Sequence, residues 1–257
     1  MRAVLWLAAA QALLLLVALV HPASVNLLVP WPASPLNARF IASLYVSLGF
    51  GVVLSSFGRS FLEMRIVLVG IAFATTLLWF LTMLRMVVHP GELSKFPLFW
   101  LLFYTVDPIL IGLVFLRRGW GGAAEGPRPL APIWLAQATC FTVAGLVSLF
   151  LPDLARTLWP WTATEPQVQL YSAFFLTIGL TSLLAAREPR WLGVRWVALM
   201  TALLAVLVIG TSLLHLPRFR EGVATTAWFT FFSLEAVLFG GLFVSRSIRP
   251  QRGATVS

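Results

Sequence analysis

Two acidic residues lie deep inside apolar stretches of this sequence. Asp107 and Glu235 each follow about 11 positions of a predicted helix, which at about 1.5 Å per residue puts them roughly 16 Å from one membrane surface, near the bilayer midplane. A carboxylate at that depth costs on the order of 2.5–3.5 kcal/mol. We therefore expect the two acids to bind a cation or carry a proton, or else to serve as hydrogen-bonded packing contacts between helices. Pro108, next to Asp107, lacks an N–H and would free a carbonyl one turn earlier.

Arginines and histidines near one predicted membrane surface are further candidates. Arg39 and Arg85 could pair with the acids across a water-filled cavity, or could extend to the membrane surface. His89 and His215 end two predicted helices, and two imidazoles near a symmetry axis could ligate a haem iron or another metal. One histidine per half, without a carboxylate cluster, is a weak metal motif. We therefore expect no cofactor.

Enzymatic motifs do not accompany these residues. The sequence contains no Gly-rich phosphate loop, no HExxH, no GxSxG and no aspartate-rich prenyl-phosphate motif. Cys140 is the single cysteine, which excludes an intramolecular disulfide, a CxxC motif and a thiolate metal site. We expect no catalytic residues, and the sequence favours a protein that is not an enzyme.

The composition indicates a membrane protein. Hydrophobic residues make up 60% of the 257 positions and charged residues 11%, against about 45–50% and about 25% in a typical soluble domain. The chain is basic, with 18 Lys and Arg against 9 Asp and Glu. A nucleic-acid-binding protein would gather that charge on one face of a soluble module, whereas here it lies in short connections between apolar segments. We expect the lipid bilayer, and no nucleic acid, as its partner.

Apolar segments long enough to cross a membrane, which takes about 20 residues, follow one another along the chain. They cover residues 3–20, 36–57, 66–88, 96–116, 133–151, 168–186, 196–214 and 224–244. The first resembles a secretory signal, but its length of about 18 residues and its counterpart in the second half favour a retained helix. The predicted fold is therefore an all-α membrane protein with eight transmembrane helices.

The distribution of positive charge predicts the orientation, because Lys and Arg are retained on the cytoplasmic side. One set of alternate connections holds Arg2, Arg59, Arg65, Arg117, Arg118, Arg128, Arg187, Arg190, Arg195, Arg246, Arg249 and Arg252. The other set holds Arg39, Lys95, Arg156, Arg218 and Arg220, with Arg85 just inside a helix. The first set is larger, so we expect a multi-pass protein of the cell membrane with both termini in the cytoplasm.

The second half of the sequence repeats the first. An offset of 128 aligns residues 100–107 (WLLFYTVD) with residues 228–235 (WFTFFSLE), and so pairs Asp107 with Glu235. An offset of 130 pairs Arg65 with Arg195 and residues 30–31 with residues 160–161, both Pro-Trp. Small changes of offset fall in connections, as insertions do.

This repeat predicts the domain organisation. Residues 1–118 form one four-helix repeat, residues 119–130 a Gly- and Pro-rich cytoplasmic linker, and residues 131–257 a second repeat with a short basic tail. Each repeat has an even number of spans, so both insert in parallel, related by a pseudo-two-fold axis along the membrane normal.

Glycines and tryptophans suggest how the helices pack and end. Close helix approach is expected at Gly49, Gly51, Gly112, Gly179, Gly240 and Gly241. The connections at residues 29–39 and 158–166 are rich in Trp and Pro. We expect them to form caps with indole rings at the headgroup level, or else a gating lid.

Two local motifs resemble a group of uncharacterised bacterial polytopic membrane proteins. The motifs are Pro-Leu-Asn-Ala-Arg at residues 35–39, after the Pro-Trp cap, and His-Leu-Pro-Arg-Phe at residues 215–219. The resemblance spans most of both halves. It implies the many-helix architecture of a bacterial inner-membrane protein and implies no activity.

Three functions fit these features. The first is binding or transport of a proton, cation or small solute between the repeats, with Asp107 and Glu235 at the centre. The second is a structural or accessory subunit of a larger membrane complex. The third is a haem- or quinone-linked redox protein that uses His89 and His215.

Overall fold

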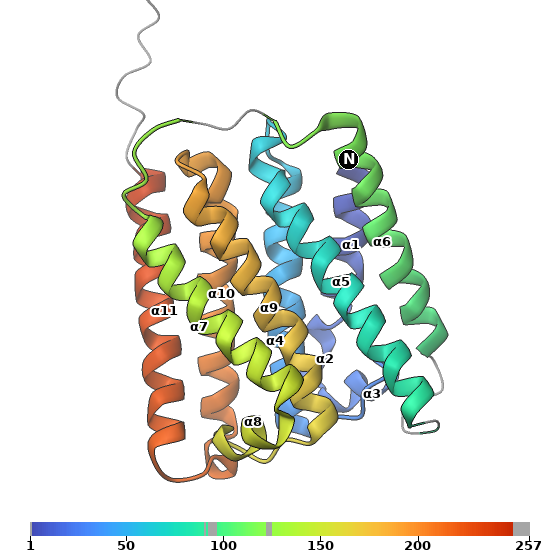
Figure 1. The fold of residues 1–257 in the computed structure, drawn as a ribbon. Coiled ribbons are helices and arrows are strands. Elements are labelled where there is room, and N and C mark those ends of the chain that lie inside the picture. Colours follow the sequence, from blue (N-terminus) through green and yellow to red (C-terminus); the bar gives the residue numbers. More distant parts are fainter. Residues whose placement is uncertain (1, 90, 92–96, 122–124, 249–257) are drawn as a thin grey trace, which may run out of the picture.

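The computed structural model describes residues 2–89, 91, 97–121 and 125–248 (Figure 1). In this part of the chain eight helices are long and apolar enough to cross a membrane, which confirms the predicted all-α class and the eight spans. Lys95, Arg249, Arg252, the basic tail and residues 122–124 of the predicted linker lie outside the described residues.

The helices match the predicted segments closely. The long ones are α1 (Arg2–Leu13), α4 (Pro35–Ser56), α5 (Leu62–Val88), α6 (Pro97–Arg118), α7 (Ala131–Phe150), α9 (Glu165–Arg187), α10 (Trp191–Leu214) and α11 (Val223–Ile248). The short ones are α2 (Leu16–Val20), η1 (Pro22–Ser24), α3 (Val25–Leu28), α8 (Pro152–Leu158) and η2 (Leu216–Arg218).

The first span differs from the prediction because it is interrupted. It consists of α1 and α2, with a turn at Leu14 and Leu15 between them. There the N–H of Leu15 donates to the carbonyl of Ala12, three residues back, at 3.3 Å. In an α-helix each N–H donates to the carbonyl four residues earlier, and this pattern is therefore lost one turn after Gln11.

Four helices form the centre of the bundle and four form its rim. The central helices α4, α5, α9 and α10 are the most buried spans, and α11 on the rim is the least buried. Helix α4 packs against α1 and α10, while α9 packs against α7 and α5. On the rim, α6 packs against α5 and α11 packs against α10. The central helices of one half of the sequence therefore pack on those of the other half.

The two ends of the bundle are easily told apart in Figure 1. One end, here called the termini end, carries the N-terminus, the connection from α6 to α7 and the last turn of α11. The other end, here called the cap end, carries α3 and α8. The connections at residues 21–34, 151–164 and 215–222 all lie at the cap end.

The tryptophans of the cap end are buried inside the protein. Trp31, Trp159 and Trp161 are each less than 7% exposed. The indole Nε1 of Trp161 donates to Oδ1 of Asn37 at 2.7 Å, and the ring packs on Phe40 with centroids 5.4 Å apart. Both connections fold back and fill the end of the bundle, so these rings pack on protein and are not exposed as membrane anchors would be. Their level relative to the headgroups stays a prediction.

Only some of the singled-out glycines bring helices together. An added Cβ would clash with the neighbouring helix at Gly49, Gly51 and Gly179. It would have room at Gly112, Gly240 and Gly241, so the expectation of close helix approach is wrong at these three positions. The contact at Gly179 is the least adaptable, since a Cβ there would lie 3.2 Å from the backbone N of Thr142 and 3.3 Å from the carbonyl O of Ala138.

Alanine at two of these glycines should change stability in opposite directions. Gly179→Ala forces α9 away from α7, and such overpacking costs about 1–3 kcal/mol. Gly241→Ala adds the same methyl group in open space and removes the entropic disadvantage of glycine in a helix, about 0.5–1 kcal/mol. Melting temperatures of the purified variants in detergent should therefore fall for the first and hold or rise for the second. Equal melting temperatures would contradict the packing seen here.

Candidate functional site

The acid of the first half borders a small cavity between α1, α4, α5 and α6. Asp107 on α6 is 1% exposed. With Gln11, Tyr45, Thr75 and Tyr104 it lines a cavity of about 30 Å³. A cavity needs about 10–15 Å³ to hold a water molecule, so this one has room for a small guest. The carboxyl group therefore lies beside a small space whose walls are mostly apolar, with these polar side chains among them.

Two polar atoms around this cavity lack partners. Oδ1 of Asp107 and Nε2 of Gln11 make no hydrogen bond within the described structure. Gln11 lies close enough to interact with the carboxyl group, but without the geometry of a normal hydrogen bond. The hydroxyls of Tyr45 and Tyr104 bond to each other at 2.6 Å. Since an unpaired buried polar group costs about 1–3 kcal/mol, a guest that brings a proton or a positive charge to Oδ1 of Asp107 would be stabilised here.

The acid of the second half is held in a closed hydrogen-bond network. Nε2 of Gln137 donates to Oε2 of Glu235 at 2.7 Å and lies 3.3 Å from Oγ1 of Thr201. Oγ of Ser182 donates to Oε1 of the same glutamine at 2.8 Å. All four residues are buried. This acid joins α11 to α7, and through Gln137 to α9 and α10, as a packing contact does.

The two acids therefore have separate surroundings. The polar neighbours of Asp107 come from α1, α4 and α5, and those of Glu235 come from α7, α9 and α10. Helices α6 and α11, which carry the acids, lie at opposite edges of the bundle in Figure 1. The structure does not bring them to one central site, which the repeated sequence had suggested.

Two sequence differences explain why one site is open and the other closed. Asp107 aligns with Glu235 at an offset of 128, but its side chain is one methylene shorter. At that offset Gln137 aligns with Ala9, and the glutamine of the first half comes two residues later, at Gln11. A shorter acid and a displaced amide leave a gap that the second half fills with a direct hydrogen bond.

The aromatic neighbours differ in the same sense. At an offset of 128 Tyr104 aligns with Phe232, and at an offset of 130 Tyr45 aligns with Phe175. The hydroxyl pair beside Asp107 thus has only two phenyl rings as its counterpart in the second half. The first site is the more polar of the two.

A second cavity lies at the centre of the bundle, between α4, α5, α9 and α10. It measures about 50 Å³. Its hydroxyl-bearing walls are Ser47, Thr177, Thr181 and Thr201. Leu48 and Phe174 line both this cavity and the one beside Asp107, so they form the wall between them. The central space therefore has the open acid on one side and, through Thr201, the closed network on the other.

Two ion pairs at the termini end join the halves of the chain. Arg65 of α5 pairs with Glu188, which follows α9. Arg195 of α10 pairs with Glu63 at the start of α5. The side chains of both glutamates are nearly fully buried. Each half therefore supplies an arginine to the other half's carboxylate.

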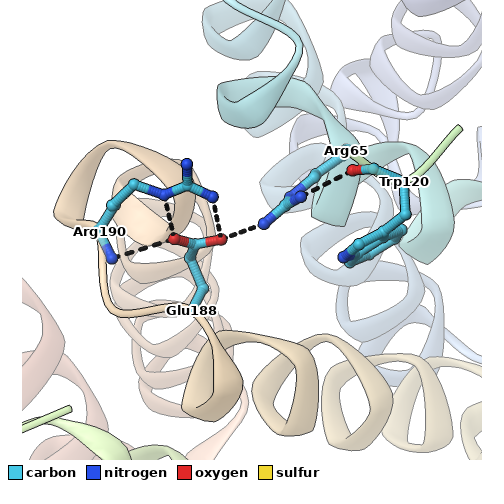
Figure 2. Close-up of polar contacts among 4 residues, drawn as sticks. All are labelled: Arg65, Trp120, Glu188 and Arg190. Atoms are coloured by element: carbon cyan, nitrogen blue, oxygen red, sulfur yellow. Dashed lines mark hydrogen bonds and ion pairs between the residues drawn. The ribbon is translucent and has the colours of Figure 1, made fainter. Parts of the chain in front are cut away.

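Figure 2 shows the contacts around Glu188. Nε of Arg190 donates to one carboxylate oxygen at 2.7 Å, and Arg65 binds the other. Arg65 also donates to the carbonyl of Trp120 at 2.7 Å and lies over its indole ring, 4.8 Å from the centroid. Burial by itself raises the pKa of Glu188, but hydrogen bonds from Arg190 and Arg65 outweigh it and lower the pKa below its ordinary value of 4.5.

Glycines make room for both carboxylates. A Cβ on Gly58 would lie 3.1 Å from Cβ of Glu63, and one on Gly193 would lie 2.7 Å from Cγ of Glu188. At an offset of 130 Gly58 aligns with Glu188 and Gly193 aligns with Glu63. Each half therefore has its glutamate where the other half has glycine, and both reach the same local arrangement from different positions.

The predicted arginine and histidine candidates lie at the cap end, away from both acids. Nη1 of Arg39 contacts Nε2 of His215 at 2.6 Å, and Arg85 faces Glu165 at 3.9 Å. Since arginine only donates, Nε2 of His215 accepts, which requires a neutral imidazole. Burial, then the charges of Arg39 and Arg218, lower the pKa of His215 and favour that form.

The predicted histidine ligands do not form a cluster of metal-binding side chains among the described residues. His89 ends α5 in an exposed position, and Nε2 of His215 is already engaged by Arg39. Among the residues that the structure describes, no three His, Cys, Asp or Glu side chains gather as a metal site would require. Haem or metal ligation by the two histidines stays a prediction.

Several side chains that define these sites escaped prediction from the sequence. Gln11 and Gln137 are each the single amide in an otherwise apolar segment, and that isolation is the signal that could have revealed them. Glu63 and Glu188 fall just outside predicted spans, in connections where charged residues are usually solvated.

No protein-family model, curated protein or solved structure matches this chain.

The ion pair of Glu188 should contribute strongly to stability. Glu188→Gln leaves Arg65 buried without its carboxylate. Breaking such a pair costs about 3–5 kcal/mol, and we expect the lower end because Arg65 keeps its bond to Trp120. Asp153→Asn is the matched control, since this exposed carboxylate pairs with Arg156, and an exposed pair is worth about 0–1 kcal/mol. Melting temperature in detergent should fall clearly only for the first variant.

The same ion pair predicts a pH dependence. Because the pKa of Glu188 is lower in the folded protein than its ordinary 4.5, the contribution is present above pH 4.5 and is lost as pH falls through the folded value. The melting temperature of the unmodified protein should therefore drop more steeply below pH 4.5 than that of Glu188→Gln. Parallel curves would show that the carboxylate carries no such contribution.

Proposed function

We propose that this chain is a multi-pass membrane protein of two parallel four-helix repeats, residues 1–118 and 131–257, with both termini in the cytoplasm. Reciprocal packing supports the repeat, since α4 packs on α10 while α9 packs on α5, as a pseudo-two-fold axis requires. The ion pairs show the same reciprocity: Arg65 of the first half pairs with Glu188 of the second, and Arg195 of the second half pairs with Glu63 of the first. Among the described residues, arginines are more numerous at the termini end, which favours the cytoplasmic side there.

The function we propose is binding and movement of a proton or a small monovalent cation at Asp107. One observation carries it: a fully buried carboxyl group with an unpaired oxygen borders a cavity large enough for a single small guest. A bare carboxylate is too costly in such a place, so it must be neutralised by a proton or by a cation. One carboxylate balances one positive charge, which favours a monovalent guest.

The neighbours of Asp107 suit this role. The tyrosine hydroxyls and the carbonyl of Gln11 are neutral oxygen ligands, which small cations accept together with a carboxylate. Pro108 has no N–H, so the backbone carbonyl of Tyr104, four residues earlier, lacks its helical donor and is a further candidate oxygen ligand. For a proton, the two hydroxyls are bonded to each other and line the same cavity, where a water molecule would connect them to the carboxyl group.

The second acid has a supporting role in this proposal. Glu235 already has its hydrogen bond from Gln137, so it needs no guest. Its network holds α7, α9, α10 and α11 together while the first repeat changes its protonation or its cation. Movement across the membrane requires the aromatic residues of the cap end and the ion pairs of the termini end to separate in turn, with the repeats moving against each other.

A second candidate is an accessory subunit of a larger membrane assembly. The observation that favours it is the exposure of α11, the least buried span, which presents Leu234, Val237 and Val244 outward. Copurification of a stoichiometric partner in mild detergent, lost on replacing these residues with alanine, would support it.

Flux through proteoliposomes tests the leading proposal. We expect acid or cation flux, read by dyes trapped inside the vesicles, to be abolished by Asp107→Asn and to persist in Glu235→Gln. The matched amide variants separate the roles of the two acids. Melting temperature in choline chloride is the control for folding: without a guest cation, Asp107→Asn should melt no lower than the unmodified protein, because it removes an unpaired carboxyl group. Equal flux in Asp107→Asn and the unmodified protein would contradict the proposal.

Cation binding has its own signature. A guest that binds only the folded state raises stability by RT ln(1 + [L]/Kd). If sodium or potassium is the guest, replacing choline chloride with its chloride should raise the melting temperature of the unmodified protein and of Glu235→Gln, but not of Asp107→Asn. A proton-specific site gives flux with no such rise. A rise of equal size in all three proteins would exclude Asp107 as the cation ligand.

A further inference from the structure

A large apolar groove lies between rim helices α7 and α11, which diverge toward the cap end in Figure 1. Its volume is about 810 Å³, within the range of about 300–1,000 Å³ of small-molecule sites. Buried aromatic rings of Trp159, Phe175 and Phe232 lie along it. Small side chains on the two helices, including Ala144 and Ala227, leave the space open.

The length of the groove matches one leaflet of a bilayer. On α7 its lining runs from Thr139 to Ser148, which is roughly 14 Å at about 1.5 Å per residue. Half of a hydrocarbon core about 30 Å thick is about 15 Å. At its cap end the groove reaches Pro160 and Val223. It therefore extends from the middle of the helices to the membrane surface, as a lipid chain does.

Arginines stand at the cap end of this groove. The backbone N–H of Arg220 donates to the carbonyl of Pro160, a groove residue, at 2.8 Å. Nη1 of Arg220 lies 3.3 Å from the carbonyl O of Arg156, so the two arginines are neighbours. Both are exposed. The nearby acids are Asp153, which pairs with Arg156 at 3.3 Å, and Glu221, next in sequence to Arg220.

From this arrangement we infer that the groove binds an anionic phospholipid, with one acyl chain along α7 and α11 and the phosphate at Arg156 and Arg220. The apolar lining selects a hydrocarbon chain because it offers few polar groups. The phosphate accepts hydrogen bonds from the guanidinium groups. An anionic lipid is preferred because its headgroup has no ammonium group to repel the arginines. A lipid bound here would also cover the sides of the Trp159, Phe175 and Phe232 rings that face the groove.

Native mass spectrometry of the detergent-solubilised protein tests the inference, because it separates lipid adducts and dimers by mass. The probes are phosphatidylglycerol and phosphatidylcholine with identical acyl chains. We expect the first phosphatidylglycerol to bind on the order of fivefold more tightly. This is the effect of about one arginine on an anionic headgroup, since Arg156 is already paired with Asp153. Arg156→Gln with Arg220→Gln should make the two lipids equal, and both sites are exposed, so folding is preserved.

Groove-filling variants locate the bound lipid. Ala227→Trp, or the milder Ala144→Leu if the first does not fold, should remove the tight phosphatidylglycerol adduct. Val237→Trp is the control, because Val237 is an exposed residue of α11 that does not line the groove. Equal binding of both lipids to the unmodified protein, a tight adduct that survives groove filling, or a dimer whose formation excludes lipid would each overturn the inference.

Discussion

A carboxyl group inside a hydrocarbon layer must be neutralised or fully hydrogen-bonded, and this constraint explains how the molecule is organised around its two intramembrane acids. The second half meets it with a direct hydrogen bond from Gln137 to Glu235. The first half does not, since Oδ1 of Asp107 and Nε2 of Gln11 have no partner in the described structure. What remains beside Asp107 is a small cavity, lined mostly by apolar side chains, in which a proton or a cation would neutralise the carboxyl group.

The rest of the bundle keeps that cavity in place. The central helices α4, α5, α9 and α10 cross-pack the two halves, and the pairs Arg65–Glu188 and Arg195–Glu63 tie them at the termini end. At the cap end the indoles of the Trp- and Pro-rich connections fold inward. The differences between the two acid sites are local. Asp107 is one methylene shorter than Glu235, Gln11 lies two positions later than the residue aligned with Gln137, and only the first site has two tyrosine hydroxyls.

Hydropathy and charge predicted what depends on local sequence. The eight spans follow from apolar runs of about 20 residues, and the two acids stood out because few other charges lie in those runs. The partners of the acids could not be predicted, because Gln11 meets Asp107 only through the packing of α1 beside α6. Burial of Trp161 likewise depends on Asn37, 124 positions away. The split of the first span at Leu14 and Leu15 has no proline or glycine to announce it.

Infrared difference spectroscopy of the reconstituted protein tests the central claim most directly, because the carbonyl stretch of a protonated carboxyl group reports on each acid separately. If Asp107 exchanges its proton with solvent or with a cation, raising the pH or adding sodium should remove such a band from the unmodified protein and from Glu235→Gln. Asp107→Asn should lack that change. A band that responds identically in Asp107→Asn would contradict the account.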